Sequence, residues 1–407
     1  MIGPTGMQRR AAAWLLGHFR FAAARIAILA AVNAFAFLGL PELSAWDEQR
    51  YEVSALEMVR SGDAIVTTYG GRPDYENLKP PLALWLMSAC CRIFGEGHFA
   101  LRFPSACAAV LGVLLTIAGV RRAADRRTAL LAGLFLATCY PYFLKHSGRS
   151  ANADAVLTLF LALASYALLR LEASRWAGVS VGASLGAGFL AKSFAILPNA
   201  ALAAICLLRR RDLIRRRGAP LLAGALLFAA IVGGWAWLRF RAEGHGRFFG
   251  AMVAQDIVGK GTEPLGQRES SPLYYVAILA RQPAVLVILV GGAAWLWSRR
   301  HRAPGEIGAR SIFGGELGFL SVAWVAITLV LFSVIPTRHF WYINPVYPAL
   351  AVLAALAVTS LGRRAASPFR VLVALAALIL PAVIGEAQIV RGIQRDLHPT
   401  HSNRHVP

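Results

Sequence analysis

Acidic side chains and cysteines are scarce in this sequence of 407 residues. Asp and Glu together number 21 against 42 Lys and Arg, and charged residues of both signs make up 15% of the chain, whereas hydrophobic residues make up 57%. A soluble protein has about 25% charged residues, so the composition argues against one. The five cysteines are odd in number and irregularly spaced, which argues against a disulfide framework and against a metal cluster.

Apolar runs fill most of the sequence. Each run is about 18 to 22 residues long, which is enough for a helix to cross the roughly 30 Å hydrocarbon layer of a membrane. We therefore predict an all-α polytopic membrane protein with a single membrane domain over residues 1–407 and no C-terminal soluble domain. Eleven spans are expected, at residues 21–40, 101–120, 128–144, 153–171, 177–191, 193–208, 219–239, 273–297, 316–335, 341–361 and 369–390.

The arginines lie in clusters in every second loop between these spans, for example at 121–127, 209–217 and 299–310. The positive-inside rule places these loops, and with them the N-terminus, on the cytoplasmic side. Short basic clusters between apolar runs are signals of topology, so the net charge of +21 does not indicate a nucleic-acid partner.

Two long segments are expected on the opposite side, at residues 41–100 and 240–272. The first contains the apolar segment 82–95, which at about 14 residues is too short to cross comfortably. Counting it as a crossing would also place the arginine clusters outside, so we predict a juxtamembrane or re-entrant helix there. The second segment is longer than a connection requires, which favours a mobile lid over a site.

The first outward segment has the pattern of a functional helix. Residues 45–60 have helical spacing, and Asp47, Arg50 and Tyr51 are three and four residues apart, so they would share one face. A structural alternative is open, because Ser44 to Asp47 also fits a capping box, in which an acid in the first turn only stabilises the helix.

A second carboxylate, Asp154, lies at the outer mouth of the span 153–171. A carboxylate inside lipid costs about 2.5 to 3.5 kcal/mol, so it should face water, a cation or a cavity, although it also fits an N-cap. The cations expected on the same side are Lys79, Lys145, Arg149, Lys192, Arg268 and Arg338. Two acids and several cations together predict a site for an anionic ligand, with a carboxylate as general base.

Five short motifs follow one another through this region. They are Asp47-Glu48-x-Arg50-Tyr51, Ser61-Gly62-Asp63, Lys79-Pro80-Pro81-Leu82-x-x-Trp85, Phe94-Gly95 and Leu101-Arg102-Phe103-Pro104-Ser105. In order and spacing they resemble the N-terminal signature of the GT-C polyprenyl-phosphate-sugar transferases, in the branch that includes lipid A 4-amino-4-deoxy-L-arabinose transferase and the protein O-mannosyltransferases. Later segments from Arg149 to Asp154 and from Phe332 to Pro345 are also similar, so the resemblance covers most of the chain.

The resemblance implies a GT-C-type bundle of about eleven transmembrane helices, with juxtamembrane helices in the first outer loop. It also implies an inverting enzyme that moves a sugar from a polyprenyl-phosphate donor of the undecaprenyl type to a lipid, glycan or protein acceptor at the extracytoplasmic face. By their motifs, Asp47 is implied as the catalytic carboxylate and Asp154 as the second acid. Contacts with the donor phosphate are expected from Lys79, Arg50, Tyr51, Arg338 and Tyr342. Contacts with substrate or lid are expected from Glu48, Tyr75, Lys192, Arg268 and His339.

Two glutamates are the candidate ligands of a divalent metal ion, which would be bound through oxygen. Both depart from the family pattern: Glu76 stands two positions from the place directly before Lys-Pro-Pro, and Glu269 replaces a histidine. High Ala, Arg and Gly content is typical of a bacterium with GC-rich DNA, which would place the protein in the inner membrane with its site facing the periplasm.

Two other classes of protein stay open. A secondary transporter or lipid flippase would also carry charge and broken helices in the membrane. The absence of an inverted repeat in the sequence and the grouping of charge at one face favour the enzyme. A non-catalytic assembly partner is disfavoured because Asp47 and Asp154 are both present. Lys192 and His339 also fit interfacial side chains without a ligand.

Overall fold

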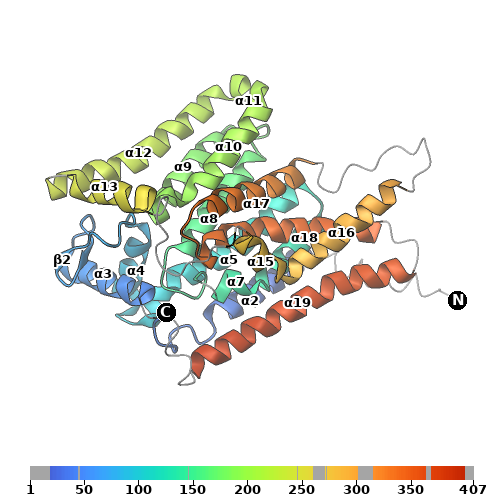
Figure 1. Ribbon diagram of the computed structural model, residues 1–407, viewed down its shortest axis with the longest axis horizontal. Helices are drawn as coiled ribbons and strands as arrows, with labels where there is room; N and C mark the ends of the chain where they lie inside the picture. The colour runs from blue at the N-terminus through green and yellow to red at the C-terminus, as the bar shows by residue number, and fades with distance from the viewer. Residues whose placement is uncertain are drawn as a thin grey trace.

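The computed structural model describes residues 19–44, 46–144, 146–244, 246–259, 271, 273–300, 315–363 and 368–398, and nearly all of this is helical (Figure 1). The main bundle of helices consists of α2 (Phe19–Phe35), α5 (His98–Ala123), α6 (Arg126–Ala137), α7 (Tyr140–Leu144), α8 (Asp154–Leu168), α9 (Trp176–Lys192), α10 (Leu197–Arg209), α11 (Arg211–Arg216), α12 (Gly218–Glu243), α15 (Tyr274–Ala280), α16 (Pro283–Arg300), α17 (Glu316–Val334), α18 (Tyr347–Arg363) and α19 (Pro368–Leu397). The other elements are α3 (Asp47–Ser61), β1 (Thr68–Tyr69), β2 (Arg72–Pro73), α4 (Leu82–Phe94), the 3-10 helices η1 (Ser193–Ile196) and η3 (Phe340–Val346), α13 (Arg247–Met252) and the π-helix η2 (Val253–Gly259).

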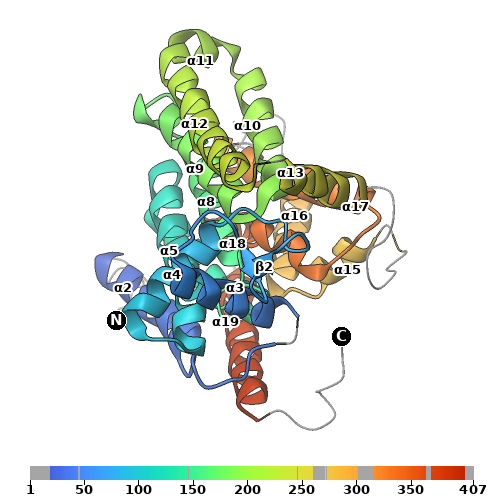
Figure 2. The same ribbon diagram turned by 90° about the vertical axis from the view of Figure 1, so that its left-hand side faces the viewer.

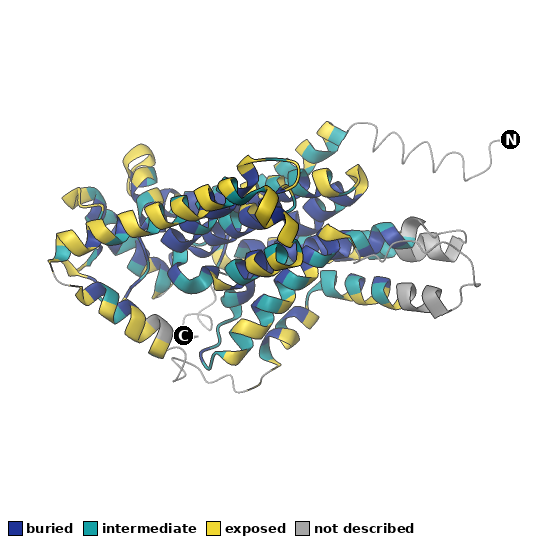
Figure 3. Cartoon of the chain, turned by 90° about the horizontal axis from the view of Figure 1, so that it is seen from above, coloured by how far each residue is buried: buried dark blue, intermediate teal, exposed yellow. Residues whose placement is uncertain are grey.

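The centre of the bundle is formed by α5, α6, α8 and α18. Helix α5 packs against α6 and α8, and α6 packs against α18. Helices α9 and α12 extend this core on one side, and α2 and α19 cover it on the other (Figure 1). Buried residues fill the interior, whereas the outer helices carry the exposed ones (Figure 3). Several of the exposed side chains are large and apolar, such as Leu222 and Leu226 on α12, as expected of a surface that faces lipid.

The prediction of an all-α polytopic membrane protein is confirmed, and the number of eleven spans stays a prediction. Within the described ranges, six helices are long and apolar enough to cross a membrane, or seven if α15 and α16, which meet at an 87° bend, form one span. The shorter helices α2 and α8 occupy two further predicted spans, 21–40 and 153–171, with 17 and 15 residues.

The helical stretch from Trp176 to Arg209 is 34 residues long, yet it runs through the bundle and back. Lys192, at the end of α9, pairs with Asp154 at the start of α8. Arg210, directly after α10, pairs with Glu172 beyond the other end of α8. The chain therefore reverses direction between α9 and α10, as the separate predicted spans 177–191 and 193–208 require.

Glycines allow α9 and α12 to approach each other closely. A Cβ atom on Gly182 would stand 1.9 Å from the carbonyl oxygen of Gly224, and one on Gly178 would stand 2.8 Å from the backbone of Pro220. A side chain at either position would push the two backbones apart. Such close approach through small residues is typical of helix packing in membrane proteins.

The first outward segment forms a layer of its own at one end of the bundle, where α3, α4 and the β1–β2 hairpin lie together (Figure 2). The predicted helices at 45–60 and 82–95 are confirmed as α3 and α4. Helix α3 ends at Gly62, whose φ of 73° is in the left-handed region that glycine adopts without strain.

The local prediction of a capping box is wrong. Trp46 stands at the N-cap without a side-chain hydrogen bond, while the amide and hydroxyl of Ser44 both donate to Glu48. The described part of the predicted long segment 240–272 is largely helical, because α12 continues to Glu243 and is followed by α13 and η2. Its role as a lid stays a prediction.

Candidate active site

Asp47, the first residue of α3, faces a group of basic side chains. Its carboxylate lies 3.6 Å from Nδ1 of His146. Burial works against ionisation of Asp47, but Lys79, His146, Lys192 and His339 together outweigh it and hold the pKa of the carboxyl group below its ordinary value of 3.8. Asp47 is therefore a carboxylate at neutral pH, surrounded by residues from four separate stretches of the chain.

Asp154 lies in the same site with a different partner. Its two carboxylate oxygens accept hydrogen bonds of 2.6 and 2.7 Å from Nζ of Lys192. The Lys192 ammonium also lies 6.0 Å above the ring of Tyr342. The imidazole of His146 is within electrostatic reach of both Asp47 and Asp154. The two acids therefore converge, as the sequence predicted.

His146 is the residue that the sequence reasoning missed. Its ring stacks on Trp341, with centroids 4.1 Å apart and planes inclined by 17°. The ring of Phe340 stands nearly perpendicular to it, with the two centroids 5.8 Å apart. Its backbone has a φ of 51°, and its carbonyl accepts a hydrogen bond from Asn344. Burial lowers the pKa of His146 in spite of the neighbouring carboxylates, which favours a neutral ring at pH 7. The one feature of the sequence that could have identified His146 as a site residue is its position in the loop 145–152, shortly before Asp154.

Lys79 is placed by the Lys-Pro-Pro sequence that leads into α4. Its ammonium group lies 5.2 Å above the ring of Tyr51, which is buried in α3 one helical turn after Asp47. The cation is thus held beside Asp47 without a carboxylate of its own among the ion pairs of the described residues.

Arg50 turns away from this group. It donates to both oxygens of Asp74 and to Glu76, and its guanidinium lies over the ring of Tyr69. Two carboxylates of the following loop therefore occupy the donors of Arg50, and its contact with the donor phosphate stays a prediction.

Glu48 has a structural position instead of the predicted contact with substrate or lid. It is buried, pairs with Arg102 of α5 at 3.0 Å, and accepts hydrogen bonds from Ser44 and the amide of Ala151. These bonds outweigh burial and lower its pKa. Glu48 thereby connects α3 to α5 and to the backbone just before Asp154, which fixes the two acids relative to one another.

The remaining predicted residues lie in different places. His339 lies within electrostatic reach of Asp47 and stacks on Trp341 at 4.4 Å. Arg338 donates to the carbonyls of Ser271 and Ser333, which orients the turn before η3. Tyr75 lies at 4.3 Å under Arg247 of α13 and close to Glu243, between the first outward segment and α12. Arg268 and Glu269 lie outside the described residues.

The described residues do not provide a donor set for the predicted metal. Glu76 is 79% exposed and pairs with Arg50, and no group of three or more His, Cys, Asp or Glu side chains that could hold a metal occurs in the part of the chain that the structure describes. Metal binding through Glu76 and Glu269 stays a prediction.

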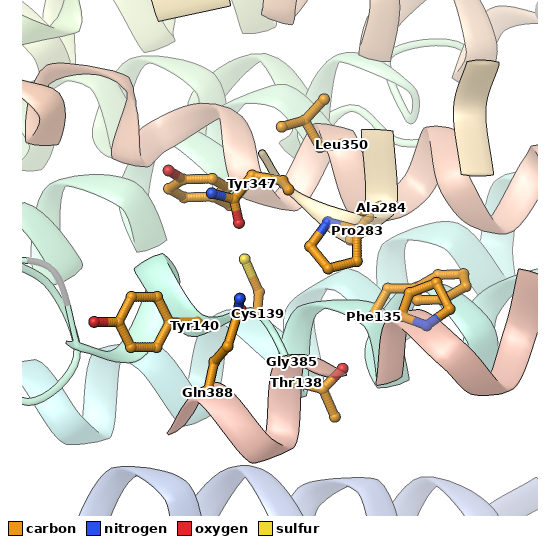
Figure 4. A pocket seen from close by; sticks show the side chains of 13 residues that line it. Phe135, Thr138, Cys139, Tyr140, Pro283, Ala284, Tyr347, Leu350, Gly385 and Gln388 are labelled. Atoms are coloured by element: carbon orange, nitrogen blue, oxygen red, sulfur yellow. The ribbon is translucent and has the colours of Figure 1, made fainter. Parts of the chain in front are cut away.

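Two apolar hollows lie behind the site. One of about 30 Å³ is enclosed by Cys139, Tyr140, Pro283 and Tyr347 among other residues (Figure 4). The other, of about 210 Å³, shares Tyr140 and Tyr347 and reaches Phe340. Phe340, which lines this hollow, also lies beside the ring of His146, so the polar site borders apolar space on this side.

The arrangement of helices matches proteins of known structure. ArnT from Cupriavidus metallidurans bound to undecaprenyl phosphate superimposes with a TM-score of 0.70 at 20% identity, over 92% of this chain and 73% of that protein. The oligosaccharyltransferase of Archaeoglobus fulgidus superimposes with a TM-score of 0.56 at 14% identity, over 96% of this chain and 59% of that protein. The chain therefore has the GT-C fold of membrane glycosyltransferases.

Sequence comparison narrows the class. Residues 78–237 match the family described as dolichyl-phosphate-mannose-protein mannosyltransferase. The undecaprenyl phosphate-α-4-amino-4-deoxy-L-arabinose arabinosyl transferase of Aeromonas salmonicida is 32% identical over 354 residues, which are 80% of this chain and 58% of that protein. The chain spans less than two thirds of the curated relatives it matches. Within the GT-C fold, the chain is therefore similar in sequence to these arabinosyl transferases.

Proposed function

We propose that this protein is a glycosyltransferase that takes a sugar from a polyprenyl-phosphate donor of the undecaprenyl type and transfers it, with inversion, to a lipid, glycan or protein acceptor. The proposal rests on one observation: Asp47 and Asp154 converge in a site lined by Lys79, Lys192 and His339. The similarity to ArnT and to the mannosyltransferase family supports the same reaction class.

The two acids are suited to different tasks. Both oxygens of Asp154 are bound by Lys192, and its side chain is 6% exposed. The Asp47 side chain is 42% exposed, and its contact with His146 is longer, at 3.6 Å. Asp47 is thus the carboxylate that an acceptor hydroxyl can reach, and Asp154 is the group that holds Lys192 in place.

The departing group determines what else the site must supply. A phosphate monoester has a second pKa near 6, so it leaves without a proton donor and needs mainly positive charge and hydrogen bonds. Lys79, Lys192 and His339 supply these on one side. Asp47 orients the acceptor hydroxyl and receives its proton as the new glycosidic bond forms and the bond to the phosphate oxygen breaks. A single displacement of this kind inverts the anomeric carbon.

The site is proposed to face the periplasm of a bacterial inner membrane. The arginine clusters at 121–127 and 209–217 lie at the other end of α5, α8 and α9 from Asp47 and Asp154. Under the positive-inside rule, the end that carries the arginines is cytoplasmic.

Asp47→Asn is the direct test. Purified wild-type protein is expected to convert a labelled polyprenyl-phosphate sugar in the presence of an acceptor mixture, and Asp47→Asn is expected to reduce kcat about 10² to 10⁴-fold, the usual contribution of a general base. Asp212→Asn, the same substitution at the exposed arginine-rich end, serves as control and should keep full activity.

Equal turnover by the wild type and Asp47→Asn would remove Asp47 from the mechanism. Movement of the intact donor lipid across a liposome membrane by wild-type protein, without release of polyprenyl phosphate, would instead support the flippase and contradict the transferase.

A further inference from the structure

A crevice of about 380 Å³ opens at the arginine-rich end of the bundle. It lies between the last turns of α5 and α8 and the first turns of α9. Along α8 it begins at Leu163, about 14 Å from Asp154 at 1.5 Å per residue, and it reaches Leu169 just after the helix, about 22 Å from Asp154. The crevice is therefore separate from the candidate active site.

The lining changes from apolar to basic along the membrane normal. Its deep end, toward the middle of the bundle, is formed by Leu115 of α5 and Leu163 of α8. Its rim carries Arg122 at the end of α5 and Arg170 just after α8. Above the deep end, the exposed Leu111 continues the apolar surface along α5. Arg122 and Arg170 stand about two helical turns from the apolar end. A phospholipid has the same arrangement, with a charged headgroup at one end and apolar acyl chains at the other.

The charges at the rim favour an anion. No Asp or Glu is among the residues that line the crevice. Neither Arg122 nor Arg170 makes an ion pair with the described residues. Glu172, two residues after Arg170, pairs with Arg210, which also pairs with Glu316. A choline or ethanolamine group would find no carboxylate here, whereas a phosphate would find two guanidinium groups.

The neighbouring tryptophan places this rim at the membrane surface. Trp176, which also lines the crevice, is 64% exposed, and the guanidinium of Arg175 lies 5.4 Å over its ring. Exposed tryptophans with basic neighbours are typical of the level of the lipid headgroups.

We propose that this crevice binds an anionic glycerophospholipid of the arginine-side leaflet, with its phosphate between Arg122 and Arg170 and its acyl chains against Leu115 and Leu163. Basic pockets between transmembrane helices on the cytoplasmic side bind such headgroups, and the cytoplasmic leaflet carries anionic lipids that give it a negative surface potential.

Native mass spectrometry of the full chain tests the proposal. The wild type, released from detergent with phosphatidylglycerol, phosphatidylcholine or undecaprenyl phosphate, is expected to retain one phosphatidylglycerol more tightly than the other two lipids. The double variant Arg122→Gln/Arg170→Gln is expected to bind it at least tenfold more weakly. Arg122→Lys/Arg170→Lys keeps the charge and should recover part of the affinity.

The matched control is Arg126→Gln/Arg127→Gln, which removes the same charge at the same end of the bundle outside the crevice, and it should retain the lipid. Equal loss in both double variants would show general attraction of anionic lipid and overturn the site. Unchanged binding in Arg122→Gln/Arg170→Gln, or preference for phosphatidylcholine or undecaprenyl phosphate, would also overturn it. Gel filtration of each variant separates these outcomes from misfolding.

Discussion

The residues around Asp47 show how one carboxylate is kept ionised while it stays half-buried. Burial alone would raise its pKa, and the basic side chains of four chain segments reverse this effect. Of these, Lys79 contributes most to the lowering. The basic neighbours of Asp47 thus lower its pKa while its side chain stays 42% exposed.

Removal of Lys79 should therefore move the acid limb of the pH profile. Because the pKa of Asp47 lies below 3.8 in the folded protein, wild-type kcat/KM should hold down to about pH 4 and fall only as the pH drops through the lowered pKa. Lys79→Met raises that pKa, so the residual activity should begin to fall at a higher pH. A limb at the same pH in both proteins would contradict the electrostatic role of Lys79.

His146 is expected to position Asp47 through its ring, which is fixed between Asp47 and Trp341. His146→Gln should lower kcat about tenfold to a hundredfold, since small misplacements of a reacting group cost this much, and should change KM little. His98→Gln, the same substitution at a histidine whose Nδ1 lies 3.1 Å from the carbonyl oxygen of Pro41, is the control. A KM effect alone would show that His146 binds substrate instead.

At the scale of elements, α3 shows what helical periodicity does and does not determine. The sequence predicts the helix and the spacing of its polar residues. Yet Asp47 points to His146, Glu48 to Arg102, and Arg50 to Asp74. The partners come from α5, from the loop before α8 and from the hairpin region, so the direction of each side chain depends on segments far away in the sequence.

The contact between α9 and α12 allows a sharp test of helix packing. Gly182→Ala places a Cβ against the Gly224 backbone and should lower the melting temperature in detergent by several degrees. Gly233→Ala on α12 meets nothing within 4 Å and should leave stability unchanged or raise it, because alanine has about 1 kcal/mol better helix propensity than glycine. Equal melting temperatures for the two variants would contradict the close approach.

At the scale of the molecule, the polar site and the arginine clusters lie at opposite ends of the same helices. Asp154 and Lys192 meet at one end of α8 and α9, while Glu172 and Arg210 meet at the other. The polar site and the arginine clusters must therefore lie on opposite sides of the membrane, and locating one of them locates the other.

Cysteine labelling in intact cells tests this orientation. In a background without the native cysteines, a cysteine at Glu76, which is 79% exposed, should react with a membrane-impermeant maleimide. A cysteine at Arg215 on α11 should react only after the membrane is opened. The reverse pattern would refute the periplasmic location of the site.

The sequence by itself determined the membrane class and the helices α3 and α4, because hydrophobic length and helical spacing are local properties. It also placed Asp47 and Asp154 on the same side of the predicted spans, which indicated a shared site. Only the tertiary structure decided that Arg50 and Glu48 are held in ion pairs, that Asp154 is bound by Lys192, and that His146 faces Asp47. Each of these contacts depends on which distant side chain lies beside a given carboxylate in the folded protein. The packing of the helices sets that, and no local pattern in the sequence encodes it.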